Sequence, residues 1–180
     1  MINLKQSKKG CPDDDRSYFK YKIKSNDFWI SENKLSDKLC NDIINLKVPL
    51  IDLEEIVWNY LNEANEKAGW RYQIDSIEKM QLHRYNSDNN YTWHRDGLGD
   101  HFGTWPNGKT RKLSMSILLN RDFKGGEFSF FATSRKYPKN VLDVKGQAMT
   151  FPSFLSHQVS DVTEGTRYTL VVFFLGDPFV

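Results

Sequence analysis

A histidine and a carboxylate two residues apart could together hold one metal ion in this chain. They are His94 and Asp96, in a segment whose residue types are typical of a β-strand. Side chains two residues apart in a strand point to the same face, so both could bind a single cation. A surface pair of polar residues beside a turn would show the same pattern. The two residues therefore indicate a metal site only if further ligands are found elsewhere in the chain.

A second histidine could complete such a site. His157 follows a Pro- and Ser-containing turn, at the point where a strand is expected to begin. It could equally be a histidine that packs beside apolar residues. Together with His94 and Asp96 it would supply two imidazoles and one carboxylate, a set that binds Fe(II) and leaves one side of the ion open. The chain between Asp96 and His157 is long enough for several antiparallel strands to bring these residues together.

An arginine at the start of the last apolar segment could bind an anion. Arg167 opens the run RYTLVVFFL, and a buried guanidinium needs an anionic partner because burying it unpaired is costly. Asp161 or Glu164 could be that partner, which would make Arg167 structural. Alternatively, Arg167 binds the carboxylate of a small diacid through paired hydrogen bonds, with the hydroxyl of Tyr85 as a further donor.

Two further features could border the site. His83 shares a strand face with Tyr85 and Gln81, so it either lines the same pocket or simply packs there. The long loop at residues 97–110 contains His101 and aromatic residues. It is interpreted either as a lid over a substrate or as an exposed loop with an aromatic anchor.

Two amphipathic helices are predicted ahead of these residues. Ser36 is a candidate N-cap for the first, Pro49 stops it, and the second ends at Gly69. Each helix should pack one face on the rest of the molecule, because its apolar positions recur at helical spacing. These positions are Leu35, Leu39, Ile43 and Leu46 in the first helix, and Leu53, Ile56, Val57, Tyr60, Leu61 and Ala64 in the second.

The rest of the chain is a series of short strand-like runs separated by Gly, Asn, Asp and Pro. Such a series without a long intervening helix predicts a mainly β sandwich or barrel, with a jelly roll among the candidates. A hairpin turn at residues 164–165 would fold the strand of Arg167 back beside His157. The predicted strands cover residues 18–24, 70–74, 79–85, 91–96, 111–119, 127–131, 141–144, 148–151 and 167–175.

Composition limits the classes of protein that this chain could be. Its 180 residues, 39% of them hydrophobic, suit one folded domain. We assign residues 1–17 to a mobile arm, 18–78 to a strand with helical support and 79–180 to the β core. The 25 basic and 23 acidic residues nearly cancel, which argues against nucleic acid or a membrane surface as a partner. The basic cluster at residues 109–112 is interpreted as a solvated face.

Targeting signals and cysteine usage suggest a compartment. The N-terminus has no apolar run that would make a signal peptide, and the longest apolar run is too short to span a bilayer. Two cysteines do not make a disulfide framework. We therefore expect a soluble monomer in the reducing cytoplasm.

The order of the candidate residues resembles the prolyl 4-hydroxylase or PKHD-type branch of the Fe(II)/2-oxoglutarate-dependent oxygenases. That branch has His-x-Asp, then a distal histidine, then a basic residue shortly beyond it. Flanking stretches resemble the branch as well, in its order, over roughly residues 79–178. They are Leu-His-Arg-Tyr at 82–85, Arg-Lys-Leu-Ser-Met-Ser-Ile-Leu-Leu-Asn at 111–120, Gly-Gly-Glu-Phe at 125–128, Lys-Gly-Gln-Ala-Met-Thr-Phe-Pro-Ser at 145–153, and His-Gln-Val-Ser-Asp-Val-Thr-Glu-Gly-Thr-Arg at 157–167.

The resemblance implies a double-stranded β-helix core, that is, a cupin-like jelly roll, and it implies an enzyme. By match, His94, Asp96 and His157 would be the ligands of Fe(II). Arg167 would bind 2-oxoglutarate, with Tyr85 as a second contact. The resemblance also implies O₂ as the other cosubstrate, ascorbate as a candidate cofactor, and succinate and CO₂ as co-products.

Two positions narrow what the resemblance implies. Some members have a second cosubstrate-binding tyrosine where this chain has Leu118, so that contact would be missing. The nucleic-acid dealkylases carry a second arginine where this chain has Phe173. The resemblance thus implies hydroxylation of a C–H bond in a peptidyl proline or another peptidyl residue. A free amino acid or small metabolite as the substrate, or a non-catalytic cupin-like metal-binding protein, remains an alternative.

Overall fold

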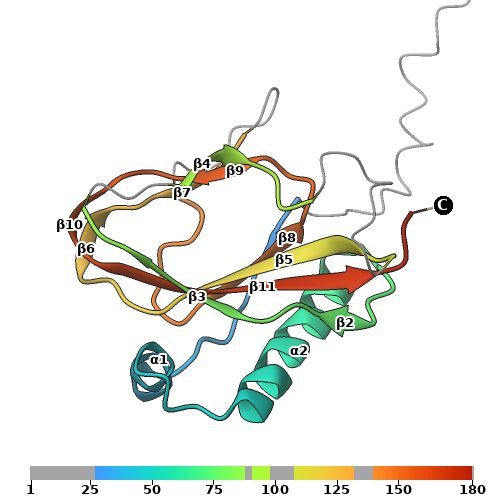
Figure 1. Cartoon of the computed structure of the whole chain (residues 1–180), viewed down its shortest axis with the longest axis horizontal. Helices are drawn as coiled ribbons and strands as arrows, with labels where there is room; N and C mark the ends of the chain where they lie inside the picture. The colour runs from blue at the N-terminus through green and yellow to red at the C-terminus, as the bar shows by residue number, and fades with distance from the viewer. Residues whose placement is uncertain (1–26, 88–90, 98–107, 132–139, 180) are drawn as a thin grey trace, which may run out of the picture.

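The computed structural model describes residues 27–87, 91–97, 108–131 and 140–179. Two antiparallel sheets face each other, and two helices lie against the outer side of the larger sheet (Figure 1). This arrangement confirms the predicted mainly β, jelly-roll architecture with N-terminal helices. The arm predicted at residues 1–17, the strand at 18–24 and most of the loop at 97–110, including His101, lie outside the described residues.

Both predicted helices form, but the first ends at Ile44, so Leu46, predicted on its apolar face, lies beyond the helix and is 79% exposed. Helix α1 (Asp37–Ile44) has Ser36 as its N-cap, whose hydroxyl accepts a hydrogen bond from the backbone nitrogen of Leu39 at 3.2 Å. Helix α2 (Leu50–Lys67) is followed by Gly69 at φ 77°, a conformation that glycine adopts without strain. Within the described residues, no helix combines the length and apolarity that crossing a membrane requires.

The larger sheet has six strands and lies between the helices and the smaller sheet (Figure 1). Strand β3 (Gln81–Tyr85) pairs with β11 (Arg167–Gly176), which also pairs with β2 (Ser76–Ile77). Within the described residues, all strand pairs of this sheet are antiparallel. The path of the sheet is β1 (Trp29–Ile30), β8 (Ala148–Pro152), β5 (Thr110–Leu118), β11 (Arg167–Gly176) and β2 (Ser76–Ile77).

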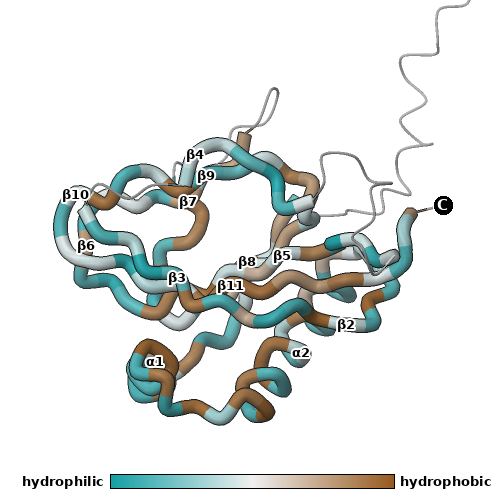
Figure 2. Tube along the Cα trace, viewed as in Figure 1, coloured by the Kyte–Doolittle hydropathy of each residue, from teal (hydrophilic) through white to brown (hydrophobic). Residues whose placement is uncertain are grey.

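Side-chain alternation divides the residues of β5 and β11 between two environments. Alternate residues such as Met115 and Val172 join α2 residues such as Leu61 in one buried core. Figure 2 shows hydrophobic residues along β11 and on the adjoining helix α2. The residues between them, such as Ser114 and Thr169, line a cavity on the other face. Both faces are covered, which explains why β5 is buried along almost its whole length.

The smaller sheet closes the cavity from the other side. Its order is β4 (Tyr91–His94), β9 (His157–Val159) and β7 (Phe128–Phe130), all antiparallel. Phe128 and Phe130 of β7 pack with Phe151 of β8 in a second buried cluster. Aromatic side chains therefore connect the two sheets.

Two predicted strands are wrong. Residues 70–74 and 141–144 are irregular in the structure. The carboxamide of Asn65 bonds both backbone groups of Tyr72, at 2.8 and 2.9 Å, in place of a neighbouring strand. The side-chain oxygen of Asn140 accepts from the backbone nitrogen of Leu142 at 3.3 Å. The alternating pattern in these segments reflects packing against the core, with Leu142 buried, and it does not reflect strand pairing.

The predicted hairpin at residues 164–165 is also wrong. These residues belong to β10 (Val162–Gly165), which pairs with β6 (Phe123–Gly125) in a separate two-stranded sheet. A Cβ at Gly165 would lie 2.2 Å from the carbonyl oxygen of Asp122. The glycine thus permits close approach to the neighbouring segment and does not make a tight turn. As a result, β9 and β11 lie in different sheets.

The packing of α2 on the larger sheet yields a test of stability. Leu61→Ala should lower the free energy of unfolding by about 2–5 kcal/mol, because it opens a cavity in the core that α2 shares with β5 and β11. Ile51→Ala on the same helix is the matched control: Ile51 is 71% exposed, so the change should be within about 0.5 kcal/mol. Urea unfolding measures both. Equal losses in the two variants would contradict the assigned orientation of α2.

Candidate metal centre

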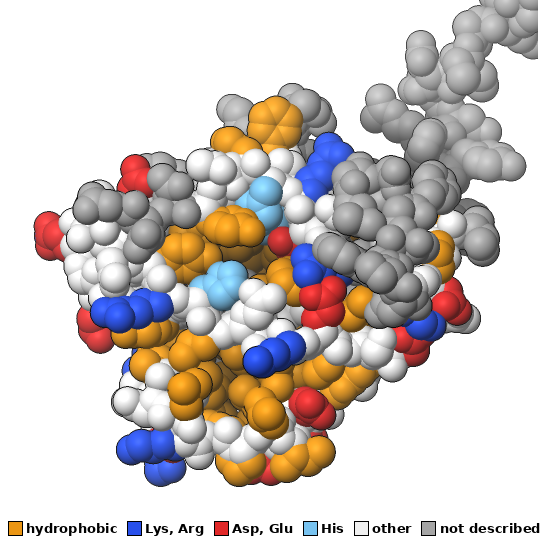
Figure 3. Space-filling view, viewed as in Figure 1, with side chains coloured by type: hydrophobic (Ala, Val, Ile, Leu, Met, Phe, Trp, Pro, Cys, Tyr) orange, Lys and Arg blue, Asp and Glu red, His pale blue; other side chains and the backbone are white. Residues whose placement is uncertain are grey.

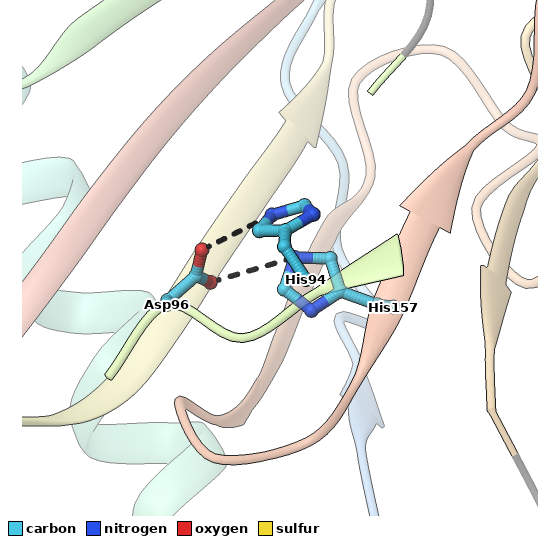
Figure 4. Close-up of side chains that lie close together, drawn as sticks. All are labelled: His94, Asp96 and His157. Carbon is cyan, nitrogen blue, oxygen red and sulfur yellow. Dashed lines mark ion pairs between the residues drawn. The ribbon is translucent and has the colours of Figure 1, made fainter. Parts of the chain in front are cut away.

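Two histidines and one carboxylate converge between the two sheets. The potential ligand atoms of His94, Asp96 and His157 all lie within 4.8 Å of one another. Asp96 Oδ1 is 3.4 Å from His94 Nε2, and Asp96 Oδ2 is 3.5 Å from His157 Nε2 (Figure 4). The structure thus brings together the three residues that the sequence predicts, from two strands and the segment after one of them.

Backbone carbonyls fix the orientation of both imidazole rings. His94 Nδ1 lies 2.7 Å from the carbonyl oxygen of Thr92, and His157 Nδ1 lies 2.8 Å from that of Leu155. A carbonyl only accepts, so each Nδ1 carries the proton and donates it. In a neutral ring Nε2 then has a free lone pair, and in both histidines Nε2 lies next to the carboxylate of Asp96.

Electrostatics favour the metal-binding form of these groups. Burial lowers the pKa of His157, and the nearby carboxylate of Asp96 offsets only part of this effect, so the ring is neutral at neutral pH. Burial opposes ionisation of Asp96, but the polar side chains that surround the carboxylate, those of His94, His157 and Ser114, outweigh this effect, so the pKa of Asp96 is lowered. Neutral imidazoles beside a carboxylate present only acceptor atoms to one point, and a cation satisfies all of them.

The strand predicted at residues 91–96 is shorter in the structure and does not include Asp96. β4 ends at His94, and Asp96 lies beyond the paired strand. The backbone nitrogens of Asp96 and Gly97 both donate to the carbonyl of Ser153, at 3.0 and 3.2 Å. The carbonyl of Asp96 accepts from Arg111 Nη1 at 2.9 Å. Contacts with β5 and with the segment after β8 therefore place the carboxylate, and strand alternation does not.

Arg111 is a residue whose role the sequence reasoning missed. Its guanidinium bonds the carboxylate of Glu78 through Nε at 2.7 Å and Nη2 at 2.6 Å, and it lies 3.8 Å above the ring centroid of Phe173. It is part-buried and not on a solvated basic face. These contacts leave Nη1 directed at the backbone of Asp96. The contact with Glu78 spans 33 residues, and no local pattern in the sequence signals it.

Arg167 is buried at 1% exposure, and no acidic side chain among the described residues pairs with it. Its Nη1 donates to Thr169 Oγ1 at 3.1 Å, whereas Nε and Nη2 have no hydrogen-bond partner among the described residues. Glu164 pairs instead with Lys124 at 2.8 Å. Burial lowers the pKa of Arg167 to about 10, so the guanidinium remains charged at neutral pH. A buried charge with two free donors fits an anionic ligand.

One cavity connects the metal-binding cluster with Arg167. It measures about 240 Å³ and is lined by the three candidate ligands, Arg167, Tyr85 and His83 among others. The register of β3 and β11 places Tyr85 directly opposite Arg167, with the guanidinium carbon 5.6 Å from the tyrosine ring centroid. Figure 3 shows the hollow on this face, bordered by histidine and hydrophobic side chains. The cavity therefore offers a metal site and an anion site within reach of one small molecule.

Comparison with known proteins identifies relatives of this architecture. Residues 80–175 match the sequence model of the 2OG-Fe(II) oxygenase superfamily. No curated protein matches the chain. The viral collagen prolyl hydroxylase of Paramecium Bursaria Chlorella virus-1, in its 2OG complex, is 18% identical with a TM-score of 0.65, covering 84% of this chain and 96% of that one.

Two cellular enzymes have similar folds. A Pseudomonas putida prolyl-4-hydroxylase is 15% identical with a TM-score of 0.64, covering 83% of this chain and 92% of that one. A Trichoplax adhaerens prolyl hydroxylase, in complex with a hypoxia inducible factor peptide fragment, is 15% identical with a TM-score of 0.57, covering 83% and 84%. At these identities the likeness concerns the fold.

The buried His157 and the half-buried His83 predict how stability depends on pH. Burial lowers the pKa of His157 and of His83 below the ordinary 6.5. As pH falls through about 6.5, the unfolded chain binds protons that the folded chain does not, so the free energy of unfolding should fall. Urea unfolding of chelator-treated protein at about pH 7.5 and about pH 5.5 measures this loss. It should be smaller in His83→Asn, and an equal loss in that variant would exclude a contribution from His83.

Proposed function

Because this chain belongs to the 2OG-Fe(II) oxygenase superfamily, we propose that it is a dioxygenase that hydroxylates a C–H bond of a peptidyl residue. His94, Asp96 and His157 hold Fe(II), and Arg167 holds the far carboxylate of 2-oxoglutarate. One observation carries the proposal. The three convergent acceptor groups and Arg167, whose Nε and Nη2 have no partner among the described residues, line the same cavity.

The donor set supports the assignment of the metal. Two neutral imidazoles and one carboxylate are the ligands that non-haem Fe(II) takes when it must keep positions open for a cosubstrate and O₂. The ring orientations fixed by Thr92 and Leu155 present Nε2 of each histidine to the ion. When bound, the iron and its cosubstrate supply the oxidising chemistry, with succinate and CO₂ as co-products.

The residues around this cluster would control water and orientation. The ring of Phe128 stacks on His157 with centroids 5.2 Å apart, and that of Phe151 meets it edge-on at 4.7 Å. These contacts hold the imidazole in place and make its surroundings apolar. An apolar wall excludes water from the reacting centre, where water would compete with the intended C–H bond.

Two contacts support the oxoglutarate assignment. Arg167 can donate from Nε and Nη2, the adjacent pair that matches the geometry of a carboxylate. Tyr85 lies opposite it across the β3–β11 pair and is the second contact. Leu118 is fully buried and has no polar side-chain group, so it contributes no hydrogen bond.

A peptidyl proline or another peptidyl residue is the proposed substrate. The support is analogy of fold, because the Trichoplax adhaerens enzyme is in complex with a peptide fragment. A free amino acid or small metabolite is the second candidate, which the modest cavity of about 240 Å³ also accommodates. A non-catalytic cupin-like role is disfavoured by membership in an oxygenase superfamily. Ascorbate is proposed as an auxiliary cofactor, and assays with and without it test this.

Removal of a metal ligand should abolish turnover and leave the fold intact. Asp96→Ala and His157→Ala should each lose iron-dependent production of succinate from oxoglutarate, because two ligands do not retain the ion in the required geometry. Glu55→Ala on the exposed side of α2 is the control and should keep full activity. Production of succinate at the wild-type rate by either ligand variant would refute the metal assignment.

Removal of the proposed clamp should weaken oxoglutarate selectively. Arg167→Met should raise the KM for oxoglutarate about tenfold to a hundredfold, because charge-assisted hydrogen bonds to the carboxylate are lost. Arg84→Ala, which removes an exposed arginine from β3, should leave KM unchanged.

The same variant separates the functional role of Arg167 from a structural one. The guanidinium has only one hydrogen bond, to Thr169, among the described residues. Its replacement by an apolar side chain should therefore not lower the free energy of unfolding. A large loss of stability in urea, with KM unchanged, would show that Arg167 serves the fold.

A further inference from the structure

His83 lines the cavity, yet the proposed chemistry gives it no role. It lies between Gln81 and Tyr85 on one face of β3, each two residues from the next. His83 Nδ1 is 3.0 Å from the hydroxyl of Tyr85, and His83 Nε2 is 2.8 Å from the side-chain oxygen of Gln81. These three side chains thus form a hydrogen-bonded chain that ends at Tyr85, the residue paired with Arg167 in the register of β3 and β11.

The direction of this chain depends on one proton. Burial, and to a lesser extent the charge of Arg167, lower the pKa of His83, so the neutral ring carries a single N–H at neutral pH. The carboxamide oxygen of Gln81 only accepts, so Nε2 carries that proton. Nδ1 must then accept, and the hydroxyl of Tyr85 donates to it.

This direction conflicts with a role for Tyr85 in binding an anion. A hydroxyl has one proton, and a proton donated to His83 is not available to a carboxylate at Arg167. The conflict disappears when the carboxamide of Gln81 rotates by half a turn. Its NH₂ group then donates to Nε2, the proton of His83 lies on Nδ1, and Nδ1 donates to the oxygen of Tyr85. Gln81 is exposed, so this rotation meets little resistance.

We propose that His83 is a positioning residue that, in a tautomer selected by Gln81, directs the hydroxyl proton of Tyr85 to the far carboxylate of oxoglutarate. The inference rests on the proposed function, because it needs a carboxylate at Arg167. It adds that affinity for the diacid depends on two residues that do not touch it. Their effect passes through a single hydroxyl group.

A double-mutant cycle tests this coupling without turnover. Oxoglutarate is titrated under anaerobic conditions into Fe(II)-loaded wild type, His83→Leu, Tyr85→Phe and the double variant, and heat or visible absorption is followed. Each single change should weaken binding about threefold to tenfold, the contribution of one hydrogen bond. The double variant should bind no more weakly than Tyr85→Phe, because without the hydroxyl His83 has nothing to direct. His83→Asn, whose amide can donate or accept, should restore most of the affinity.

Substitutions of Gln81 test the direction of the hydrogen bonds. Its side chain is exposed, so replacing it should not disturb the fold. Gln81→Glu presents only acceptors to Nε2, so it should hold Tyr85 turned toward His83 and weaken binding. Gln81→Lys presents only donors and should not weaken it. The same two changes in the Tyr85→Phe background measure the effect of charge alone, and there the difference between Glu and Lys should shrink. Titration with 2-oxopentanoate, which lacks the far carboxylate, should show no dependence on His83.

The outcomes separate this inference from the proposed function. If the wild type binds no oxoglutarate, both fail. If the wild type binds it but His83→Leu binds equally well, or the loss persists undiminished in Tyr85→Phe, the positioning role is overturned and the oxygenase assignment stands. Equal affinities of the Gln81→Glu and Gln81→Lys variants would overturn the role of Gln81.

Discussion

The larger sheet is covered on both faces, and the rest of the molecule depends on this constraint. Apolar residues at alternate positions of β5 and β11 pack on α2, and the residues between them face the smaller sheet. A strand cannot place two neighbouring side chains on one face. The same pairing that secures the core therefore also presents Arg167, Thr169 and Ser114 to the cavity. Stability and site come from one arrangement of strands.

The cavity contains buried polar groups whose partners a ligand can supply. The three candidate ligands present acceptor atoms, and Arg167 presents two donors that no described residue accepts. Burial of such groups opposes folding, and the covered sheet has to offset this. Groups already desolvated and held in position lose little freedom when the ligand arrives. This is the physical basis on which an oxygenase can bind a small diacid and an ion side by side.

Support for the site extends beyond the residues that would touch metal or cosubstrate. Arg111, held by Glu78 and stacked on Phe173, fixes the backbone of Asp96, which no strand partner fixes. Elsewhere on the cavity wall, His83 contacts the hydroxyl of Tyr85, and Gln81 in turn contacts His83. In both cases a side chain on the larger sheet controls the direction of a group that faces the ligand. The orientation of the groups that face the cavity is thus set by residues that contact those groups and do not themselves touch the metal or the cosubstrate.

The sequence by itself determined the donor set, the two helices and the mainly β class, because helix periodicity, caps and residue chemistry are local properties. It predicted His94, Asp96, His157, Tyr85 and Arg167 as one group, which the structure places around one cavity. It misplaced strands at residues 70–74 and 141–144 and a hairpin at 164–165, because alternation and glycine report burial and close approach as well as pairing and turns. Only the tertiary structure decided that β9 and β11 lie in different sheets, that Asp96 is held by Ser153 and Arg111, and that Arg167 pairs with no acidic side chain in the described part of the chain. Each of these depends on contacts between segments far apart in the chain, which no local pattern encodes.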